Sequence, residues 1–190
     1  MLDIDVVEVI NGAATKPFGF MPHYPGCGVG GHCIPVDPYY LIERAKDKGF
    51  DHRFLKLARD INEGMPAHTV SLLADALNER MTSVNGTTVG VLGLSYKADV
   101  GDRRESPSYR IIELLHRKGA EVVTHDPFLE CDEPDLMRLQ GRCDVLLLCT
   151  SHGEYRKLDL SKVKVLVDGR NMFADADIPS TCTYRGIGRH

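Results

Sequence analysis

Hydrophobic residues in the first part of the chain recur at intervals of three or four, the spacing of an α-helix with one buried side. Four stretches have this spacing: 2–10, 38–48, 53–62 and 66–81. Pro66 opens the last of them at a position where proline is tolerated, and Val70 and Leu73 follow on its apolar side. The pattern therefore predicts four helices, with a segment rich in proline and glycine between the first and the second.

The pattern changes after the turn-forming residues 83–86. Short apolar runs typical of buried strands follow at 88–94, 121–126, 144–149, 163–168 and 183–187. Helical patterns lie between them at 106–119 and near 134–139. This alternation predicts a Rossmann-like, doubly wound parallel sheet. The predicted fold class is α/β, with a helical region over 1–84 and the sheet domain over 85–190.

Composition narrows the possible functions. The chain has 190 residues and a formal net charge of -4, without a block of Lys or Arg, so we expect no binding to nucleic acid. No signal peptide and no run of 18 apolar residues is present, so we expect no membrane insertion and a cytoplasmic location. The six dispersed cysteines are predicted to be free thiols.

Candidate chemistry is concentrated in one loop, residues 24–37. Four glycines there let the backbone approach a ligand closely: Gly26, Gly28, Gly30 and Gly31. Cys33 follows as a potential nucleophile, and a buried, inert thiol is the alternative interpretation. The spacing of His23, Cys27, His32 and Cys33 is not that of paired zinc ligands, so no metal site is expected.

Ligands of an open parallel sheet bind beyond the carboxyl ends of its strands. The segment that follows the first predicted strand, 95–106, is long and charged, and Gly90 to Gly93 lack the third glycine of a dinucleotide fingerprint. Asp126, after the second strand, suits a ribose-binding acid and a strand-ending turn about equally. We therefore do not assign NAD to this domain.

Basic residues at this edge favour an anionic ligand. Lys97, Arg103 and Arg104 are suited to a phosphate, although a solvated loop with internal ion pairs is an alternative. Arg170 follows the fourth predicted strand at the same edge. Two basic sites are thus expected to converge there.

Four motifs together resemble those of the UDP-glucose/GDP-mannose dehydrogenase family, in the same order along the chain. They are 28–41 with its Gly-Gly-His-Cys-Ile-Pro core, 58–66, 93–107 and 168–171. His32 and the approach over 16–22 are most similar to members that act on UDP-N-acetylhexosamines, especially UDP-N-acetylglucosamine or UDP-N-acetylmannosamine. Enzymes that act on UDP-glucose typically have serine at this position.

The resemblance implies an NAD-dependent oxidation of the sugar C6 alcohol to a carboxylate in two hydride transfers. Cys33 would be the nucleophile that forms a thiohemiacetal and then a thioester, and Asp37 would assist proton transfer. Asp37 is also suited to cap a helix that opens at Pro38, and both roles are compatible.

The resemblance also implies the binding residues. Tyr96, Lys97 and Arg170 would hold the nucleotide of a UDP-sugar and its diphosphate. The loop with Tyr24, Gly28, Gly30 and Gly31 would cradle the sugar diphosphate. Arg104 would lie near the NAD cofactor and the domain interface, and the helices would form a homodimer.

Two departures from the family pattern bear on activity. Cys27 stands where the family commonly has proline, which suggests a redox pair with Cys33. No counterpart of the family's NAD-binding domain is present, so we expect a fragment that is inactive alone. The alternatives are a stand-alone module for nucleotide-sugar binding or dimerisation, and a UDP-glucose 6-dehydrogenase.

Overall fold

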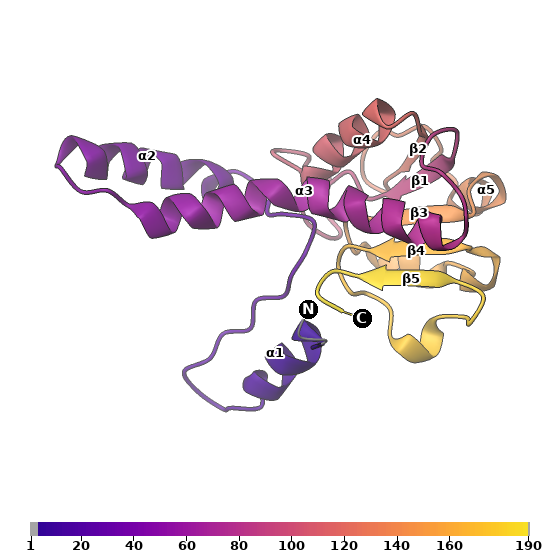
Figure 1. Ribbon diagram of the computed structural model, residues 1–190, viewed down its shortest axis with the longest axis horizontal. Helices are drawn as coiled ribbons and strands as arrows, with labels where there is room; N and C mark the ends of the chain where they lie inside the picture. Colours follow the sequence, from indigo (N-terminus) through magenta and orange to yellow (C-terminus); the bar gives the residue numbers. More distant parts are fainter. Residues whose placement is uncertain (1–3, 190) are drawn as a thin grey trace.

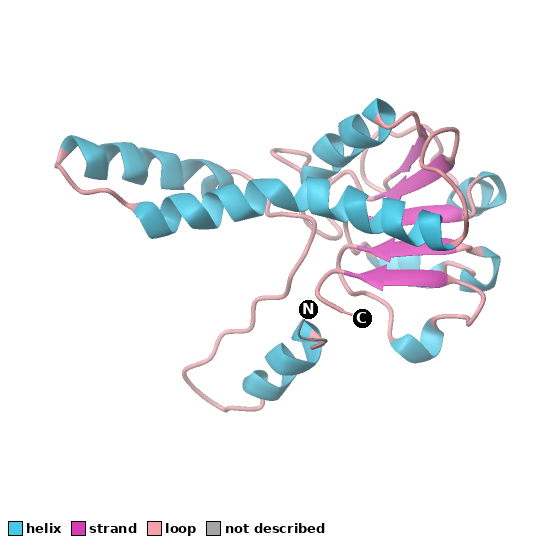
Figure 2. Cartoon of the chain, in the orientation of Figure 1, coloured by secondary structure: helices cyan, strands magenta, loops and turns pink. Residues whose placement is uncertain are grey.

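A five-stranded parallel sheet forms the centre of the computed structural model, which describes residues 4–189 (Figure 1, Figure 2). Its strands are β1 (Thr88–Leu92), β2 (Glu121–His125), β3 (Val145–Leu148), β4 (Val165–Asp168) and β5 (Thr183–Gly186). They pair in the order β2-β1-β3-β4-β5, and every neighbouring pair is parallel. The predicted α/β fold with a parallel sheet is confirmed. Because β2 and β3 lie on opposite sides of β1, a ligand crevice is expected at the carboxyl ends of β1 and β3.

Helices cover both faces of the sheet. On one face lie α4 (Pro107–Arg117) and the C-terminal half of α3 (Arg53–Glu79). On the other lie α5 (Leu136–Arg142) and the short 3-10 helices η1 (Gly153–Lys157) and η2 (Leu160–Lys162), while η3 (Asp175–Asp177) precedes β5. This arrangement is the doubly wound one that the sequence predicts.

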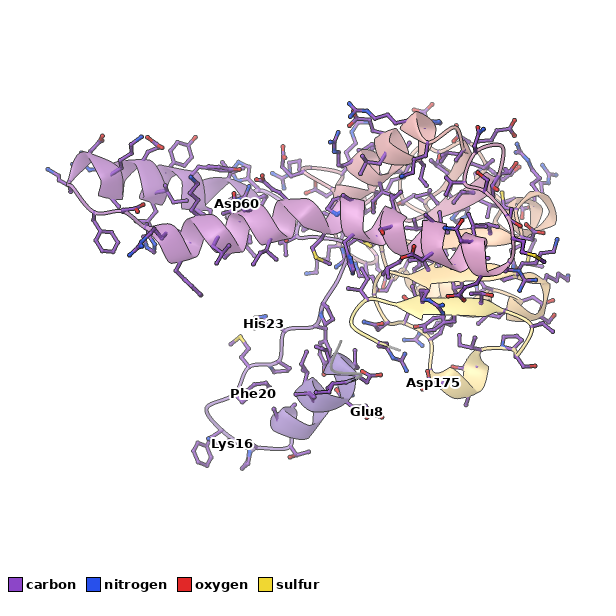
Figure 3. All side chains as sticks on the ribbon, in the orientation of Figure 1. Glu8, Lys16, Phe20, His23, Asp60 and Asp175 are labelled. Carbon is purple, nitrogen blue, oxygen red and sulfur yellow. The ribbon has the colours of Figure 1, made fainter. Side chains whose placement is uncertain are left out.

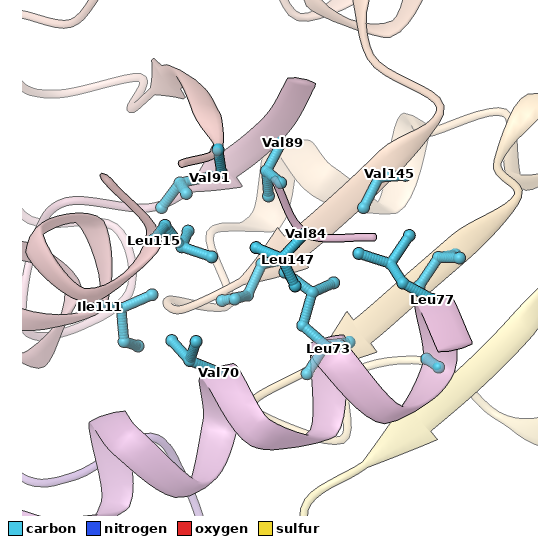
Figure 4. Packing of buried hydrophobic residues seen from close by; sticks show 14 of the residues in the cluster. Val70, Leu73, Leu77, Val84, Val89, Val91, Ile111, Leu115, Val145 and Leu147 are labelled. Carbon is cyan, nitrogen blue, oxygen red and sulfur yellow. The ribbon is translucent and has the colours of Figure 1, made fainter. Parts of the chain in front are cut away.

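Successive residues of the central strands enter opposite cores. Leu147 contributes to the core beneath α3 and α4, whereas Leu146 and Leu148 contribute to the core beneath α5. In Figure 4, Leu73 and Leu77 of α3 lie in the first of these cores with Leu147 of the sheet. Both faces of β3 are therefore buried, which explains its continuous run of apolar residues.

The remaining helices extend away from the sheet. Helix α2 (Cys33–Asp47) and the N-terminal half of α3 form a hairpin that projects outward (Figure 1). Arg59 joins the two helices, because its guanidinium stacks 4.4 Å from the ring centre of Tyr39 and donates to the Tyr39 hydroxyl over 2.9 Å. Helix α1 (Val6–Ala14) lies apart from this hairpin, beside the end of the chain, where the Val6 N–H donates to the Gly188 carbonyl.

Two helix boundaries differ from the prediction. The stretches 53–62 and 66–81 are one helix of 27 residues, α3, with Pro66 inside it. Proline removes one hydrogen bond from the helix, but the buried residues on its C-terminal half pack on the sheet and keep the helix continuous. Helix α2 begins at Cys33 rather than at Pro38, because Pro35 falls in its first turn, where no N–H is needed.

The division of the chain near residue 84 stays a proposal. Helix α3 lies before that boundary, yet Val70, Leu73 and Leu77 belong to the core of the sheet that follows it. Among the helices within residues 4–189, none combines the length and the apolar character needed to cross a membrane.

Candidate active site

Cys33 is an exposed thiol on the first turn of α2. Its sulfur lies 3.8 Å from Nδ1 of His32, the residue that precedes the helix. The thiol is therefore accessible at a helix N-terminus, with an imidazole as its neighbour. The alternative of a buried Cys33 is wrong, and its role as a nucleophile stays a prediction.

Asp37 lies inside α2, one helical turn after Cys33. Residues four apart share one face of a helix, so the carboxylate and the thiol are neighbours on the same side. The alternative role of Asp37 as the cap of a helix opening at Pro38 is wrong, because the helix has already begun at Cys33.

The Gly30–Gly31 turn packs against the loop that follows β1. A Cβ at Gly30 would lie 2.7 Å from both the Glu105 carbonyl oxygen and Cβ of Tyr96. Gly31 has a φ of 97°, and a Cβ there would lie 3.0 Å from the Tyr96 ring. Because these two glycines lack a Cβ, the loop after β1 packs closely against them. The sequence predicted a close approach of a ligand at this place instead.

Arg104 joins this contact through its backbone. Its carbonyl accepts a hydrogen bond of 2.9 Å from the Gly31 N–H. Its guanidinium is paired with Asp102, with 2.7 Å between Nη2 and Oδ2. Hydrogen bonds to Asp102 and the charge of that carboxylate raise the pKa of Arg104, and the nearby Tyr96 and Cys33 add weakly to the shift. The guanidinium is thus engaged by Asp102, while the backbone of Arg104 holds the turn that precedes Cys33.

Arg170 lies at the carboxyl ends of β3 and β4, where its Nε donates to the Cys149 carbonyl over 2.7 Å. Gly26 packs on this side chain, since a Cβ at Gly26 would lie 2.7 Å from Nη1 of Arg170. Lys97 is exposed on the loop after β1. Strands β1 and β4 are separated only by β3, so the two loops start about 10 Å apart. This edge therefore brings Tyr96, Lys97 and Arg170 to one side of the sheet.

Tyr24 does not face the sheet edge, because its hydroxyl donates to Oδ1 of Asn11 in α1 over 2.8 Å. In Figure 3, Phe20 and His23 lie on the extended segment that leads from α1 towards the glycine loop. Gly28, by contrast, is buried against Asn62 and Pro107, and its φ of 125° requires glycine.

Cys27 is fully buried, with its sulfur 3.8 Å from the Gly169 carbonyl oxygen and 3.9 Å from that of Leu148. Cys33 is exposed on α2, and all six cysteines are free. The suggested redox pair of these two thiols is not supported. No three His, Cys, Asp or Glu side chains within residues 4–189 gather as metal ligands.

The sheet does not fit NAD. Asp126 occupies the place of a ribose-binding acid but is 3% exposed, and its oxygens accept hydrogen bonds from neighbouring loops. Gly26, Gly28 and Gly31 have the spacing of a dinucleotide fingerprint, but residues 15–32 contain no strand to precede it.

Asn62 and His32 belong to the site but were not proposed as functional residues. Oδ1 of Asn62 accepts from the N–H of Val29 over 2.9 Å and so ties the glycine loop to α3. The sequence signal for Asn62 is its position one turn before Pro66, which leaves a helix carbonyl free to face Gly28.

Two models of the UDP-glucose/GDP-mannose dehydrogenase family match the chain. The central-domain model matches residues 1–64 and the UDP-binding-domain model matches residues 90–176. The chain belongs to this family. UDP-N-acetyl-D-mannosamine dehydrogenase of Pyrococcus horikoshii is 35% identical over 98% of the chain, and UDP-N-acetyl-D-glucosamine 6-dehydrogenase of Pseudomonas aeruginosa is 31% identical over 92%. The chain covers 44% and 43% of these relatives, less than half of their length.

Solved structures of the dehydrogenase family have the same fold. The structure of UDP-D-ManNAc dehydrogenase from Pyrococcus horikoshii superposes with a TM-score of 0.90 and covers 98% of this chain and 45% of that one. NDP-N-acetyl-D-galactosaminuronic acid dehydrogenase from Methanosarcina mazei Go1, at 29% identity, gives a TM-score of 0.89 over 100% of this chain and 45% of that one.

The packing of the Gly30–Gly31 turn predicts that Gly30→Ala destabilises the protein. The added methyl group must displace Glu105 backbone or Tyr96, so we expect the free energy of unfolding to fall by about 1–3 kcal/mol in denaturant titrations. Gly64→Ala is the matched control, because a Cβ at Gly64 has no neighbour within 4 Å and alanine favours a helix. An unchanged free energy for Gly30→Ala contradicts the packing.

Proposed function

We propose that this chain forms the thiol and nucleotide-sugar part of a UDP-N-acetylhexosamine 6-dehydrogenase. One observation carries the proposal: the exposed Cys33 on the first turn of α2 follows the Gly30–Gly31 turn, which packs on Tyr96 of the loop that also carries Lys97. UDP-N-acetylmannosamine and UDP-N-acetylglucosamine dehydrogenases among the relatives support the sugar class. The cytoplasm, where thiols stay reduced, suits the six free cysteines.

In this proposal Cys33 performs covalent catalysis. The thiolate adds to the aldehyde carbon at C6, and the resulting thiohemiacetal loses a hydride to become a thioester. Water then attacks the thioester carbonyl, releasing the carboxylate and the thiol. Asp37, on the same face of α2, takes the proton of the attacking water. NAD bound outside this sheet would accept the hydride here and in the preceding oxidation, in which the C6 alcohol loses a hydride and a proton to give the aldehyde.

The nucleotide is assigned to the carboxyl edge of the sheet. Lys97 and Arg170 offer two positive charges for the diphosphate, and Tyr96 offers a ring and a hydroxyl for the nucleoside. The sugar is assigned to the backbone of the glycine loop beside the Gly30–Gly31 turn and Cys33, whereas Tyr24, which turns towards α1, and the buried Gly28 lie outside this assignment. Arg104, whose guanidinium is paired with Asp102, is assigned to the side of the site that faces the cofactor.

The cofactor in this proposal is held outside the sheet of this chain, since Asp126 and the loop after β1 do not fit it. The 190-residue chain with NAD is therefore expected to form no NADH from UDP-N-acetylglucosamine, UDP-N-acetylmannosamine or UDP-glucose. A separately produced NAD-binding domain is then added. NADH formation after this addition indicates an enzyme and excludes a stand-alone binding module. The sugar that reacts fastest distinguishes a UDP-N-acetylhexosamine enzyme from a UDP-glucose enzyme.

The binding assignment predicts that Lys97→Ala and Arg170→Ala each weaken UDP binding in calorimetry by about tenfold or more. Each substitution removes charge-assisted hydrogen bonds to phosphate. Lys118→Ala is the matched control, because Lys118 follows α4 at the opposite edge of the sheet and should leave the affinity unchanged. Equal affinity in all three variants contradicts the assignment.

The proposed nucleophile predicts that Cys33 is the thiol most rapidly alkylated by iodoacetamide in the native protein. Cys27, Cys143 and Cys149 are buried and should be protected, so the fast phase should disappear in Cys33→Ser. Peptide mass spectrometry identifies the modified residue, and UDP-N-acetylglucosamine should slow the reaction if its sugar lies over the thiol. Alkylation of Cys33 no faster than that of Cys131 or Cys182 argues against a reactive thiol.

We also propose a homodimer through the α2–α3 hairpin. Phe54, Leu57 and Ile61 share one side of α3 and are 81%, 57% and 60% exposed. An apolar stripe of this kind is typical of an interface, and the occupant proposed is a second copy of this chain.

The proposed interface predicts that Phe54→Ser with Leu57→Ser converts a dimer to a monomer in light scattering coupled to size exclusion. Met81→Ser is the matched control, because Met81 is 97% exposed and lies beyond the end of α3. A wild-type chain that has the monomer mass at micromolar concentration refutes the interface.

A further inference from the structure

A buried carboxylate accepts hydrogen bonds from the loops that follow both β1 and β2. Asp126, the residue after β2, is 3% exposed. Its Oδ2 accepts from Leu94 N–H at 2.7 Å, Ser95 N–H and Ser95 hydroxyl at 2.9 Å each, and His152 Nε2 at 3.2 Å. Its Oδ1 accepts from the N–H groups of Phe128 and Leu129 at 2.8 and 3.1 Å. Burial acts to raise the pKa of this carboxyl, but the hydrogen bonds from His152 and the backbone hold it well below its usual range.

His152 extends this hydrogen-bonding network to the far end of the same loop. Its side chain is fully buried on the segment that follows β3. The Asp99 N–H donates to its Nδ1 over 2.9 Å, which assigns the hydrogen to Nε2 and makes Nε2 the donor to Asp126. One neutral imidazole therefore bridges Asp126 and Asp99.

The loop between these anchors contains no helix or strand, and inside it the Tyr96 N–H donates to the Asp102 carbonyl over 2.9 Å. Asp99 has a φ of 58°, which is unfavourable for a residue with a Cβ, and its Oδ1 accepts from the Gly153 N–H over 2.9 Å. The Thr150 hydroxyl also donates to the Ser95 carbonyl. Segments after β1, β2 and β3 are thus joined at one corner, and the loop conformation depends on these partners.

This loop carries groups that both halves of the proposed site use. Tyr96 and Lys97 lie between the two anchor points, Ser95 and Asp99. Tyr96 packs on Gly31, the residue before His32 and Cys33. A shift of the loop would therefore move the nucleotide contacts and the turn that leads to the thiol together.

We propose that Asp126 and His152 are positioning residues, which fix the loop 94–102 so that Tyr96 and Lys97 are arranged for a nucleoside diphosphate before it binds. The inference rests on the proposed function for the identity of the ligand. The same place in a dinucleotide-binding sheet offers an acid to a ribose, and here the acid is turned inward to the loop. Preorganisation raises affinity because the loop loses little freedom on binding.

The experiment distinguishes the hydrogen bond between His152 and Asp126 from the one between His152 and Asp99. His152→Asn keeps an acceptor near the Nδ1 position for Asp99, whereas His152→Gln keeps a donor near the Nε2 position for Asp126, and His152→Ala removes both. We measure backbone hydrogen exchange in the free 190-residue chain, followed by UDP affinity in calorimetry.

We expect His152→Ala to weaken UDP binding by about tenfold, the effect of losing one or two hydrogen bonds that order the loop. Exchange at Leu94, Ser95 and Asp99 should accelerate, while the amides of β1 and β3 keep their protection. The Asn and Gln variants should each restore protection at their own end of the loop and recover part of the affinity.

Asp132→Asn is the matched control. Asp132 accepts from the N–H and hydroxyl of Thr124 in β2 but is exposed and makes no hydrogen bond to residues 94–102 within the described chain. It should change neither the exchange of the loop nor the UDP affinity.

Three results overturn the proposal: unchanged exchange at 94–99 in His152→Ala, faster exchange through the whole sheet, or loop exchange that rises without loss of UDP affinity. Failure of the wild-type chain to bind UDP refutes the proposed nucleotide site instead. In that case the exchange data still report whether Asp126 and His152 hold the loop, so the two failures are distinguishable.

Discussion

The contact between the Gly30–Gly31 turn and Tyr96 is the constraint on which the geometry around Cys33 depends. It joins two parts of the chain that are distant in sequence, with Arg104 accepting a hydrogen bond from Gly31 beside it. Helix α2 packs on α3 as its hairpin partner, and this contact attaches its first turn to the sheet domain as well. The contact fixes the position of the first turn of α2, and so of the thiol, relative to the carboxyl edge of the sheet. Nucleotides bind at that edge in this class of fold.

Two buried aspartates shape the loops at that edge. Asp126 after β2 holds the loop with Tyr96 and Lys97. Asp168, at the end of β4, accepts from the N–H of Arg170 and the hydroxyl of Tyr184, although its burial raises its pKa. In both cases a carboxylate that resembles a ligand contact in sequence is directed into the protein. Lys97, by contrast, is exposed on the loop that Asp126 holds.

Much of the fold follows from local pattern. Continuous apolar runs indicated five strands, and the helices between them required parallel connections. The prediction was wrong where proline was treated as a boundary. Pro66 lies inside α3 because the C-terminal half of this helix packs on the sheet, and Pro38 lies inside α2, which begins five residues earlier at Cys33. The packing of α3 on the sheet involves residues far apart in sequence, so the local pattern does not contain it.

By itself, the sequence determined the chemical identity of the site: a thiol after a glycine-rich turn, a carboxylate four residues later, and basic residues after two strands. These are properties of residue type and order. Only the tertiary structure decided how the residues are used. It exposed Cys33 and buried Cys27, set Gly30 and Gly31 against Tyr96, and turned Tyr24 towards α1. Exposure and contact depend on distant segments that meet in the folded chain, and composition and spacing do not specify those meetings.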